Sequence, residues 1–156
     1  MEDSSYMKVL DIVEGTSVDG PGLRTSVYFS GCTHKCPGCH NPESWDMVNG
    51  KDVSIDSILK IIAENDFNVT FSGGDPFMQI NNLIILAKRI KEELNKNIWC
   101  YTGYTLEQII DNPRFRELLN YIDVVVDGRY EKEKRDISLL FRGSSNQRII
   151  EVKNIL

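Results

Sequence analysis

The alternation of predicted strands and helices between residues 54 and 126 most constrains what this chain can fold into. Within that stretch, short β-branched runs such as residues 68–72 alternate with amphipathic runs such as residues 81–95. Such alternation is typical of β-α-β units. A complete eightfold barrel needs about 250 residues, and this chain has 156. We therefore expect an α/β fold with an incomplete (β/α) barrel or splayed, mostly parallel sheet of about five or six strands.

Individual segments support this expectation. Thr105 and Gln108 have the spacing of a capping box, and Pro113 suits the first turn of a further helix. No repeat or linker divides the chain, which predicts a single domain over residues 1–156. Strands are predicted at residues 7–13, 25–29, 68–72, 98–102, 122–126 and 148–152, and helices at 54–65 and 81–95.

Composition excludes several classes of protein. The formal net charge of −5 argues against a nucleic-acid surface, which needs clustered positive charge. No apolar run reaches the length of a membrane span, and the acidic start of the chain does not resemble a signal peptide. Four cysteines are too few for a disulfide scaffold of this size. We expect a cytoplasmic protein with no nucleic-acid or membrane partner.

Three of the four cysteines, Cys32, Cys36 and Cys39, form a C-x3-C-x2-C cluster, and both histidines lie in or beside it. A structural zinc site usually takes four closed ligands in two separated pairs. A thiol-disulfide site would use Cys36 and Cys39, but Pro42 would interrupt the helix that normally follows. An iron-sulfur cluster with three thiolates would leave one iron open to another ligand. These three chemistries remain open on the spacing alone.

A second motif, the sequence from Ser72 to Pro76 (SGGDP), follows a predicted strand just as the cysteine cluster does. Because ligands bind at the carboxyl ends of parallel strands, we expect both motifs at the same edge of the sheet. Gly73 and Gly74 would let the backbone approach a ligand closely, and free carbonyls could accept hydrogen bonds from an ammonium group. The alternative is a plain strand-to-helix turn.

The two motifs together resemble the radical S-adenosylmethionine superfamily. The resemblance implies that the three cysteines bind a [4Fe–4S] cluster whose open iron is chelated by S-adenosylmethionine. It also implies that Gly73, Gly74 and Asp75 bind the methionyl ammonium, with Asp75 in place of the commoner glutamate.

The residue before the third cysteine departs from the superfamily pattern. An aromatic residue that contacts the adenine often stands there, and this chain has Gly38. The resemblance then leaves Gly38, Cys39 and His40 as the expected contacts to the cofactor. His40 is the nearest ring that could replace the aromatic residue, and its alternative is a plain polar loop residue.

Upstream, the residues Asp19, Gly20, Pro21, Gly22 and Arg24 resemble a motif of the enzymes that activate glycyl radical enzymes. Among these, the chain is similar to the activating proteins of anaerobic (class III) ribonucleotide reductase. The pyruvate formate-lyase activating enzymes share the upstream motif but are longer, and they remain the alternative. The similarity to the reductase activators rests on residues 36–39, 41–45, 72–76, 101–104, 126–130 and 141–148.

The resemblance implies an oxidoreductase that cleaves S-adenosylmethionine reductively and places a glycyl radical on the large subunit of the reductase. A low-potential donor such as flavodoxin or ferredoxin would supply the electron. The upstream motif would hold the glycine loop of the reductase. The rival classes are a zinc-binding interaction module and a small electron carrier. Asp127 and residues 142–148 could serve the cofactor, the reductase or only a solvated turn, and Cys100 is expected in the core.

Overall fold

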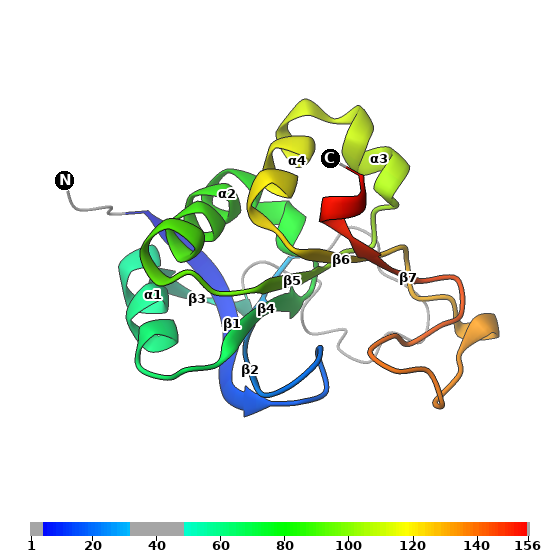
Figure 1. Ribbon diagram of the computed structural model, residues 1–156, viewed down its shortest axis with the longest axis horizontal. Helices are drawn as coiled ribbons and strands as arrows, with labels where there is room; N and C mark the ends of the chain where they lie inside the picture. The colour runs from blue at the N-terminus through cyan, green and yellow to red at the C-terminus, as the bar shows by residue number, and fades with distance from the viewer. Residues whose placement is uncertain (1–4, 32–48, 156) are drawn as a thin grey trace.

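A seven-stranded sheet of mixed direction runs through residues 5–31 and 49–155, the part of the chain that the computed structural model describes (Figure 1). The strand order is β3-β1-β2-β4-β5-β6-β7. Pairing is parallel from β2 through β4 and β5 to β6, and antiparallel for β1 with β2, β1 with β3 and β6 with β7. The strands are β1 (Tyr6–Thr16), β2 (Arg24–Phe29), β3 (Lys51–Ser54), β4 (Asn68–Gly73), β5 (Ile98–Tyr101), β6 (Val124–Asp127) and β7 (Arg148–Glu151).

The predicted α/β class is confirmed, but the prediction of a mostly parallel sheet was wrong. The seven strands also exceed the expected number. The strands β1 and β2 are joined by the short turn of residues 17–23, and so short a connection can only produce antiparallel neighbours. In the described ranges the sheet ends at β3 on one side and β7 on the other, without a pairing that closes it.

The helices begin where the sequence signals predict. Ser54 caps α1 (Ile55–Ala63) by accepting a hydrogen bond from the backbone N–H of Ser57 at 3.0 Å. Helix α2 (Ile80–Arg89) continues as a wider π turn to Leu94. Both halves of the predicted capping box open α3 (Leu106–Asp111), and Pro113 starts α4 (Pro113–Leu118). None of the helices in the described ranges has the length and apolar character needed to cross a bilayer.

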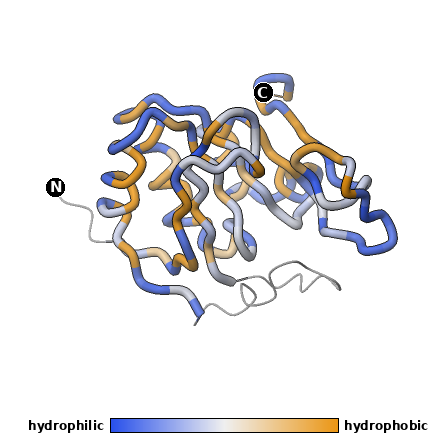
Figure 2. Tube along the Cα trace, turned by 90° about the horizontal axis from the view of Figure 1, so that it is seen from below, coloured by the Kyte–Doolittle hydropathy of each residue, from blue (hydrophilic) through white to orange (hydrophobic). Residues whose placement is uncertain are grey.

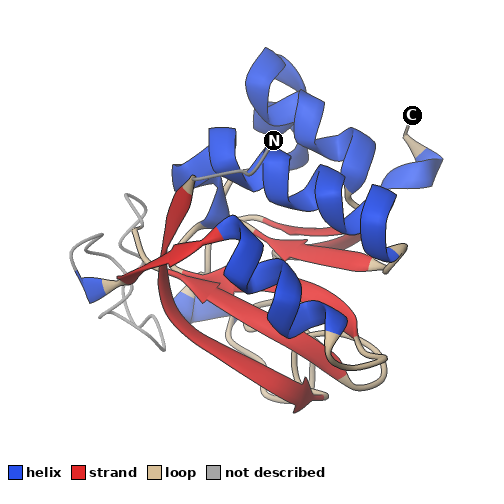
Figure 3. Cartoon of the chain, turned by 90° about the vertical axis from the view of Figure 1, so that its left-hand side faces the viewer, coloured by secondary structure: helices blue, strands red, loops and turns tan. Residues whose placement is uncertain are grey.

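The helices α1 to α4 lie on one side of the sheet (Figure 3), and hydrophobic residues recur along the helices and strands (Figure 2). Alternate side chains of a strand point to opposite faces, so only one set meets the helices. In β2 that set includes Val27 and Phe29, which are fully buried in the main core. Cys100 lies in the same core, as the sequence predicts. Arg24, Ser26 and Tyr28 point to the other face, which we call the open face of the sheet.

Candidate functional site

The end of β2 and the end of β4 are bonded together directly before the cysteine cluster. Phe29 pairs with Gly73 in parallel register, and the backbone N–H of Gly74 donates to the Phe29 carbonyl at 2.8 Å. The N–H of Asp75 then donates to the carbonyl of Gly31 at 2.7 Å, and Cys32 is the next residue in the sequence. The chain therefore enters the cysteine cluster at the edge of the sheet where the turn after β4 lies, and the predicted place of the cluster itself stays a prediction.

The other residues of the cysteine cluster lie outside the described residues. They are Cys32, Cys36, Gly38, Cys39 and His40, whose predicted roles stay predictions. Within residues 5–31 and 49–155, no three histidine, cysteine, aspartate or glutamate side chains are grouped so that they could hold a metal ion.

Gly73 occupies a position that no other residue fits. Its φ of +104° lies in the region that favours glycine. A Cβ atom there would lie 2.3 Å from the carbonyl oxygen and 2.4 Å from the nitrogen of Phe29. Glycine is therefore required here because the backbone of β2 lies where a side chain would stand. The close approach fixes the turn after β4 against the residues that lead into the cysteine cluster.

The Asp75 carboxylate is fully buried and is held by donors from two elements. Its Oδ1 accepts from the N–H of Phe77 at 3.0 Å, which caps the 3-10 turn of Pro76–Gln79. The Thr102 hydroxyl lies 3.0 and 2.9 Å from the two carboxylate oxygens, and the N–H of Gly103 donates to Oδ2 at 3.0 Å. Asp75 therefore ties the turn after β4 to the residues after β5, and these contacts occupy both of its oxygens.

Sequence reasoning missed the role of Thr102. The resemblance included residues 101–104, but it gave the threonine no partner. Its hydroxyl also accepts a hydrogen bond from the N–H of Tyr104 at 3.2 Å, and its own N–H donates to the Val126 carbonyl at 3.0 Å. A threonine at the end of the strand predicted over residues 98–102 was the one available signal.

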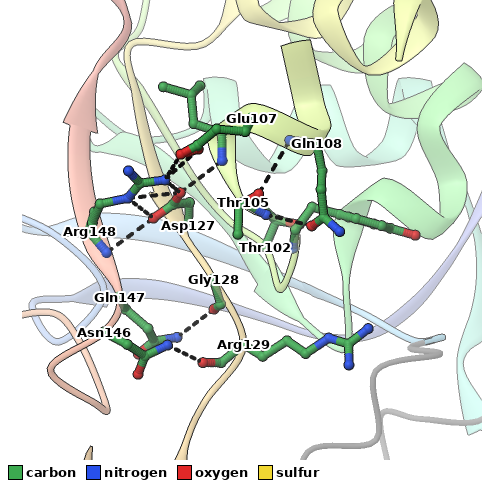
Figure 4. A network of polar contacts seen from close by, with 12 residues as sticks. Thr102, Thr105, Glu107, Gln108, Asp127, Gly128, Arg129, Asn146, Gln147 and Arg148 are labelled. Atoms are coloured by element: carbon green, nitrogen blue, oxygen red, sulfur yellow. Dashed lines mark hydrogen bonds and ion pairs between the residues drawn. The ribbon is translucent and has the colours of Figure 1, made fainter. Parts of the chain in front are cut away.

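A second buried carboxylate, Asp127, ends β6 and is 1% exposed (Figure 4). Its Oδ2 accepts from the N–H of Leu106 at 2.8 Å, and its Oδ1 accepts from Nε of Arg148 at 3.1 Å. The same guanidinium reaches the exposed carboxylate of Glu107 at 2.8 Å. Hydrogen bonding to Arg148 lowers the pKa of Glu107, and its bonds to Asp127 and Glu107 raise the pKa of Arg148. The network joins β6, β7 and the first turn of α3.

Residues 142–148 hold the long connection between β6 and β7 together (Figure 4). The side-chain oxygen of Gln147 accepts from the N–H groups of Gly143 and Ser144 at 2.9 and 3.1 Å. Its amide nitrogen donates to the carbonyl of Gly128 at 3.0 Å, and the Asn146 amide donates to the carbonyl of Arg129 at 2.8 Å. The side-chain amides of Asn146 and Gln147 thus bind this connection itself.

Arg24, predicted to dock the partner, is buried to 1% exposure. Its guanidinium donates to the Thr70 hydroxyl at 2.8 Å, the Val69 carbonyl at 2.8 Å and the Asn97 side-chain oxygen at 2.7 Å. It also lies over the ring of Trp99, 5.6 Å from its centroid. Burial lowers the pKa of Arg24 to about 10. The guanidinium also donates to the Pro21 carbonyl at 3.2 Å, so Arg24 fixes the turn of residues 17–23 to the open face from within the protein.

Asp19 also turns inward. Its Oδ2 accepts from the Ser26 hydroxyl at 3.0 Å and from the Tyr28 hydroxyl, while its carbonyl accepts from Thr70 at 2.8 Å. Burial, followed by the hydrogen bond to Asp19, raises the pKa of Tyr28 to about 12. The predicted docking residues thus divide into two groups. Asp19, Gly20 and Arg24 are buried or half-buried, whereas Pro21 and Gly22 are exposed.

Comparison with known proteins identifies the family. Residues 18–150 match the family described as a 4Fe-4S single cluster domain. The chain is 40% identical over 139 residues to the anaerobic ribonucleoside-triphosphate reductase-activating protein of Pasteurella multocida. This match covers 83% of this chain and 88% of that protein. It is 37% identical over 141 residues to the protein of the same name from Escherichia coli K12, with 83% and 89% covered. The corresponding protein of Enterobacteria phage T4 is 36% identical over 141 residues, with 85% and 86% covered. The chain therefore belongs to the family of anaerobic ribonucleoside-triphosphate reductase-activating proteins and contains a 4Fe-4S single cluster domain.

Proposed function

We propose that this protein is an oxidoreductase that generates a glycyl radical on an anaerobic ribonucleoside-triphosphate reductase. The observation that carries the proposal is family membership over most of the chain, since the relatives are named for activating that reductase. The bonded turn at Gly73, Gly74 and Asp75 supports it, because it lies beside the entry to the cysteine cluster.

In the proposed site, the residues of the cysteine cluster bind the iron-sulfur cluster and S-adenosylmethionine. Cys32, Cys36 and Cys39 hold the [4Fe–4S] cluster through their thiolates and leave one iron for S-adenosylmethionine. Gly38, Cys39 and His40 would bind S-adenosylmethionine. When bound, the reduced cluster would supply one electron to cleave S-adenosylmethionine with release of methionine, and this chemistry would remove a hydrogen atom from the glycine of the reductase.

The residues after β4 would bind the other end of the cofactor. The carbonyls of Gly73 and Gly74 accept hydrogen bonds from the methionyl ammonium. Asp75 contributes by its negative charge and by fixing that turn through Thr102, because both of its oxygens already accept hydrogen bonds. Fixed donors and acceptors of this kind orient a ligand without reorganisation during the reaction.

The open sheet also bears on how the site excludes water. We propose that residues 1–156 form a single domain that acts as an incomplete barrel, and that the reductase closes its open side. Closure would protect a reactive carbon radical from other reactants. A flavodoxin or ferredoxin would donate the electron in the cytoplasm, and neither a membrane nor a nucleic acid would take part.

One anaerobic experiment tests the function. The purified protein should be brown, and with dithionite and S-adenosylmethionine it should release 5′-deoxyadenosine. Addition of the anaerobic reductase should then give a glycyl radical signal in electron paramagnetic resonance. A colourless zinc protein would contradict the proposal, as would a brown protein that leaves S-adenosylmethionine intact. A radical formed on pyruvate formate-lyase instead would favour the alternative activase.

A further inference from the structure

The connection between β6 and β7, residues 128–147, displays the most exposed large hydrophobic side chain in the described part of the chain. Ile137 is 88% exposed and Leu140 is 68% exposed. Both lie at the tip of this connection. We call the whole connection, residues 128–147, the β6–β7 arm. Exposed apolar side chains that are gathered together on a structured element commonly mark an interaction surface.

Backbone hydrogen bonds hold the two sides of the β6–β7 arm together. Residues 134–136 face residues 143–145, with an isolated bridge between Arg135 and Ser144 and a hydrogen bond of 2.9 Å from the N–H of Ser145 to the Lys134 carbonyl. At the tip, the Asp136 carboxylate accepts from the N–H of Ser138 at 2.9 Å. These hydrogen bonds fix the backbone on both sides of the tip that carries the exposed side chains of Ile137 and Leu140.

Phe141 anchors the tip to the open face of the sheet. Its φ is +62°, and its ring packs edge-on against Trp99 with centroids 5.5 Å apart. The Tyr101 hydroxyl donates to the Phe141 carbonyl at 2.7 Å. Tyr101 directly precedes Thr102, which holds Asp75, so the arm is connected to the proposed cofactor site through adjacent residues.

The turn of residues 17–23 meets the arm at the same tryptophan. Arg24 lies over the Trp99 ring, and a Cβ atom on Gly20 would lie 3.3 Å from that ring. The turn presents Val18 and Leu23, which are 69% and 53% exposed. Figure 1 shows the turn, in blue, and the arm, in orange, on the side of the sheet away from α1 to α4. Two loops held by one buried ring therefore display exposed apolar side chains.

The charge of the arm differs from that of the rest of the chain. It contains five basic and three acidic side chains, whereas the whole chain has a net charge of −5. Lys132, Lys134 and Arg135 are exposed, and Figure 2 shows the hydrophilic stretch of the arm at the edge of the molecule. Basic residues beside an apolar tip favour a partner surface that offers apolar side chains flanked by carboxylates.

We propose that the β6–β7 arm is a recognition element for the reductase polypeptide, with Ile137 and Leu140 as its apolar anchors. This inference rests on the proposed function, because that function requires a protein substrate at the open side of the sheet. Asp19 and Arg24 position the neighbouring turn from within, and the contacts come from the tips of the turn and the arm.

The test uses the cluster-loaded protein and its reductase. The double variant Ile137→Ser, Leu140→Ser should bind the reductase about tenfold or more weakly in a titration. It should release 5′-deoxyadenosine without the reductase at the wild-type rate, and its glycyl radical yield should recover at high reductase concentration. The matched control is Ile110→Ser, an exposed isoleucine on α3. It should bind like the wild type.

A second variant, Lys134→Glu with Arg135→Glu, probes the charge and does not depend on the apolar substitutions being tolerated. It should weaken binding most at low salt. Wild-type affinity in both variants would overturn the inference while leaving the proposed function intact. If the wild-type protein cleaves S-adenosylmethionine but never places a radical on the reductase, the proposed function fails instead.

Discussion

Asp75 and Asp127 occupy equivalent places in the fold but are held by different donors. Each lies at the carboxyl end of a parallel strand, β4 and β6 respectively, and their exposures are 0% and 1%. Asp75 accepts hydrogen bonds from the Thr102 hydroxyl and two backbone N–H groups. Asp127 accepts from two backbone N–H groups as well, but its third donor is the guanidinium of Arg148.

The different donors suggest different roles: the Asp127 contacts hold the fold together, and the Asp75 contacts hold the candidate site. The Asp127 network fastens β7 and α3 to the end of β6, where a cation balances the buried carboxylate. The Asp75 network lies beside the entry to the cysteine cluster, and in the described part of the chain a hydroxyl and two backbone N–H groups fix the turn. We expect substitutions at the first network to change stability alone and substitutions at the second to change cofactor binding as well.

The largest expected effect comes from removing the cation. Arg148→Met would leave the Asp127 carboxylate buried with backbone donors alone, and the loss should be about 3 kcal/mol of unfolding free energy, the lower end for breaking a buried pair. Half of the Arg148 side chain is exposed, which is why the lower end applies. Urea unfolding of the protein would measure it. The double variant with Asp127→Asn should recover part of the loss, and a single-variant loss under about 1 kcal/mol would contradict this account.

The next effect comes from removing a neutral donor. Thr102→Val should cost about 1–3 kcal/mol, because a buried carboxylate loses one hydrogen bond. It should also weaken S-adenosylmethionine binding about three- to tenfold in a calorimetric titration, because the turn at Gly73 and Gly74 loses its support.

Thr25→Val is the matched control for that substitution. Thr25 is equally buried, and its hydroxyl bonds the side-chain oxygen of Asn65 at 3.3 Å, away from the candidate site. It should destabilise the protein while leaving the cofactor affinity unchanged. Equal losses of affinity in the two variants would remove the distinction between the Asp75 network and an ordinary buried hydrogen bond.

Much of the fold could be predicted from the sequence because its signals are local. Hydrophobic periodicity predicted β2, β4 and α2, and the Thr105 capping box predicted the start of α3. Whether neighbouring strands pair parallel or antiparallel could not be predicted from such local signals. Strand β3 is only four residues long and begins with two exposed polar residues, so it shows no alternation. The prediction then counted too few strands and too many parallel pairings.

The candidate site was predictable in its place but not in its contacts. Two motifs following two strands predicted one shared edge. The side-chain partners of Asp75 and Asp127 lie 27 and 21 residues away along the chain, and no spacing rule connects them. The contacts of Arg24 could not be predicted from the sequence either. A charged residue is rarely fully buried, so its interior position depends on acceptors that only the folded sheet brings together.

A third carboxylate, Asp19, extends the comparison to high pH. Burial and the bond to Asp19 raise the pKa of Tyr28 from 10.0 to about 12, so the folded state favours the protonated phenol. The stability from this shift is complete below pH 10 and is lost as the pH rises to about 12. Tyr28→Phe should therefore unfold with a shallower alkaline slope, with a difference of about 1 kcal/mol at most after solvent screening.

Thermal unfolding between pH 8 and pH 12 would measure that slope. Tyr6→Phe is the control, because the Tyr6 ring is 58% exposed. It should keep the wild-type pH dependence. Identical slopes in the wild type and Tyr28→Phe would show that the bond between Tyr28 and Asp19 does not favour the protonated phenol.

The smallest effect should come from Glu107, the exposed partner of Arg148. Its pKa is lowered from 4.5 mainly by hydrogen bonding to Arg148, so its contribution is present above pH 4.5 and disappears as the pH falls through the lowered value. Glu107→Gln should be slightly less stable than the wild type at pH 7 and equal to it in acid. Unfolding at both pH values would check this sign. If Glu107→Gln cost as much as Arg148→Met, the exposed pair would account for the role of the arginine. The buried Asp127 would then not depend on the cation for its stability.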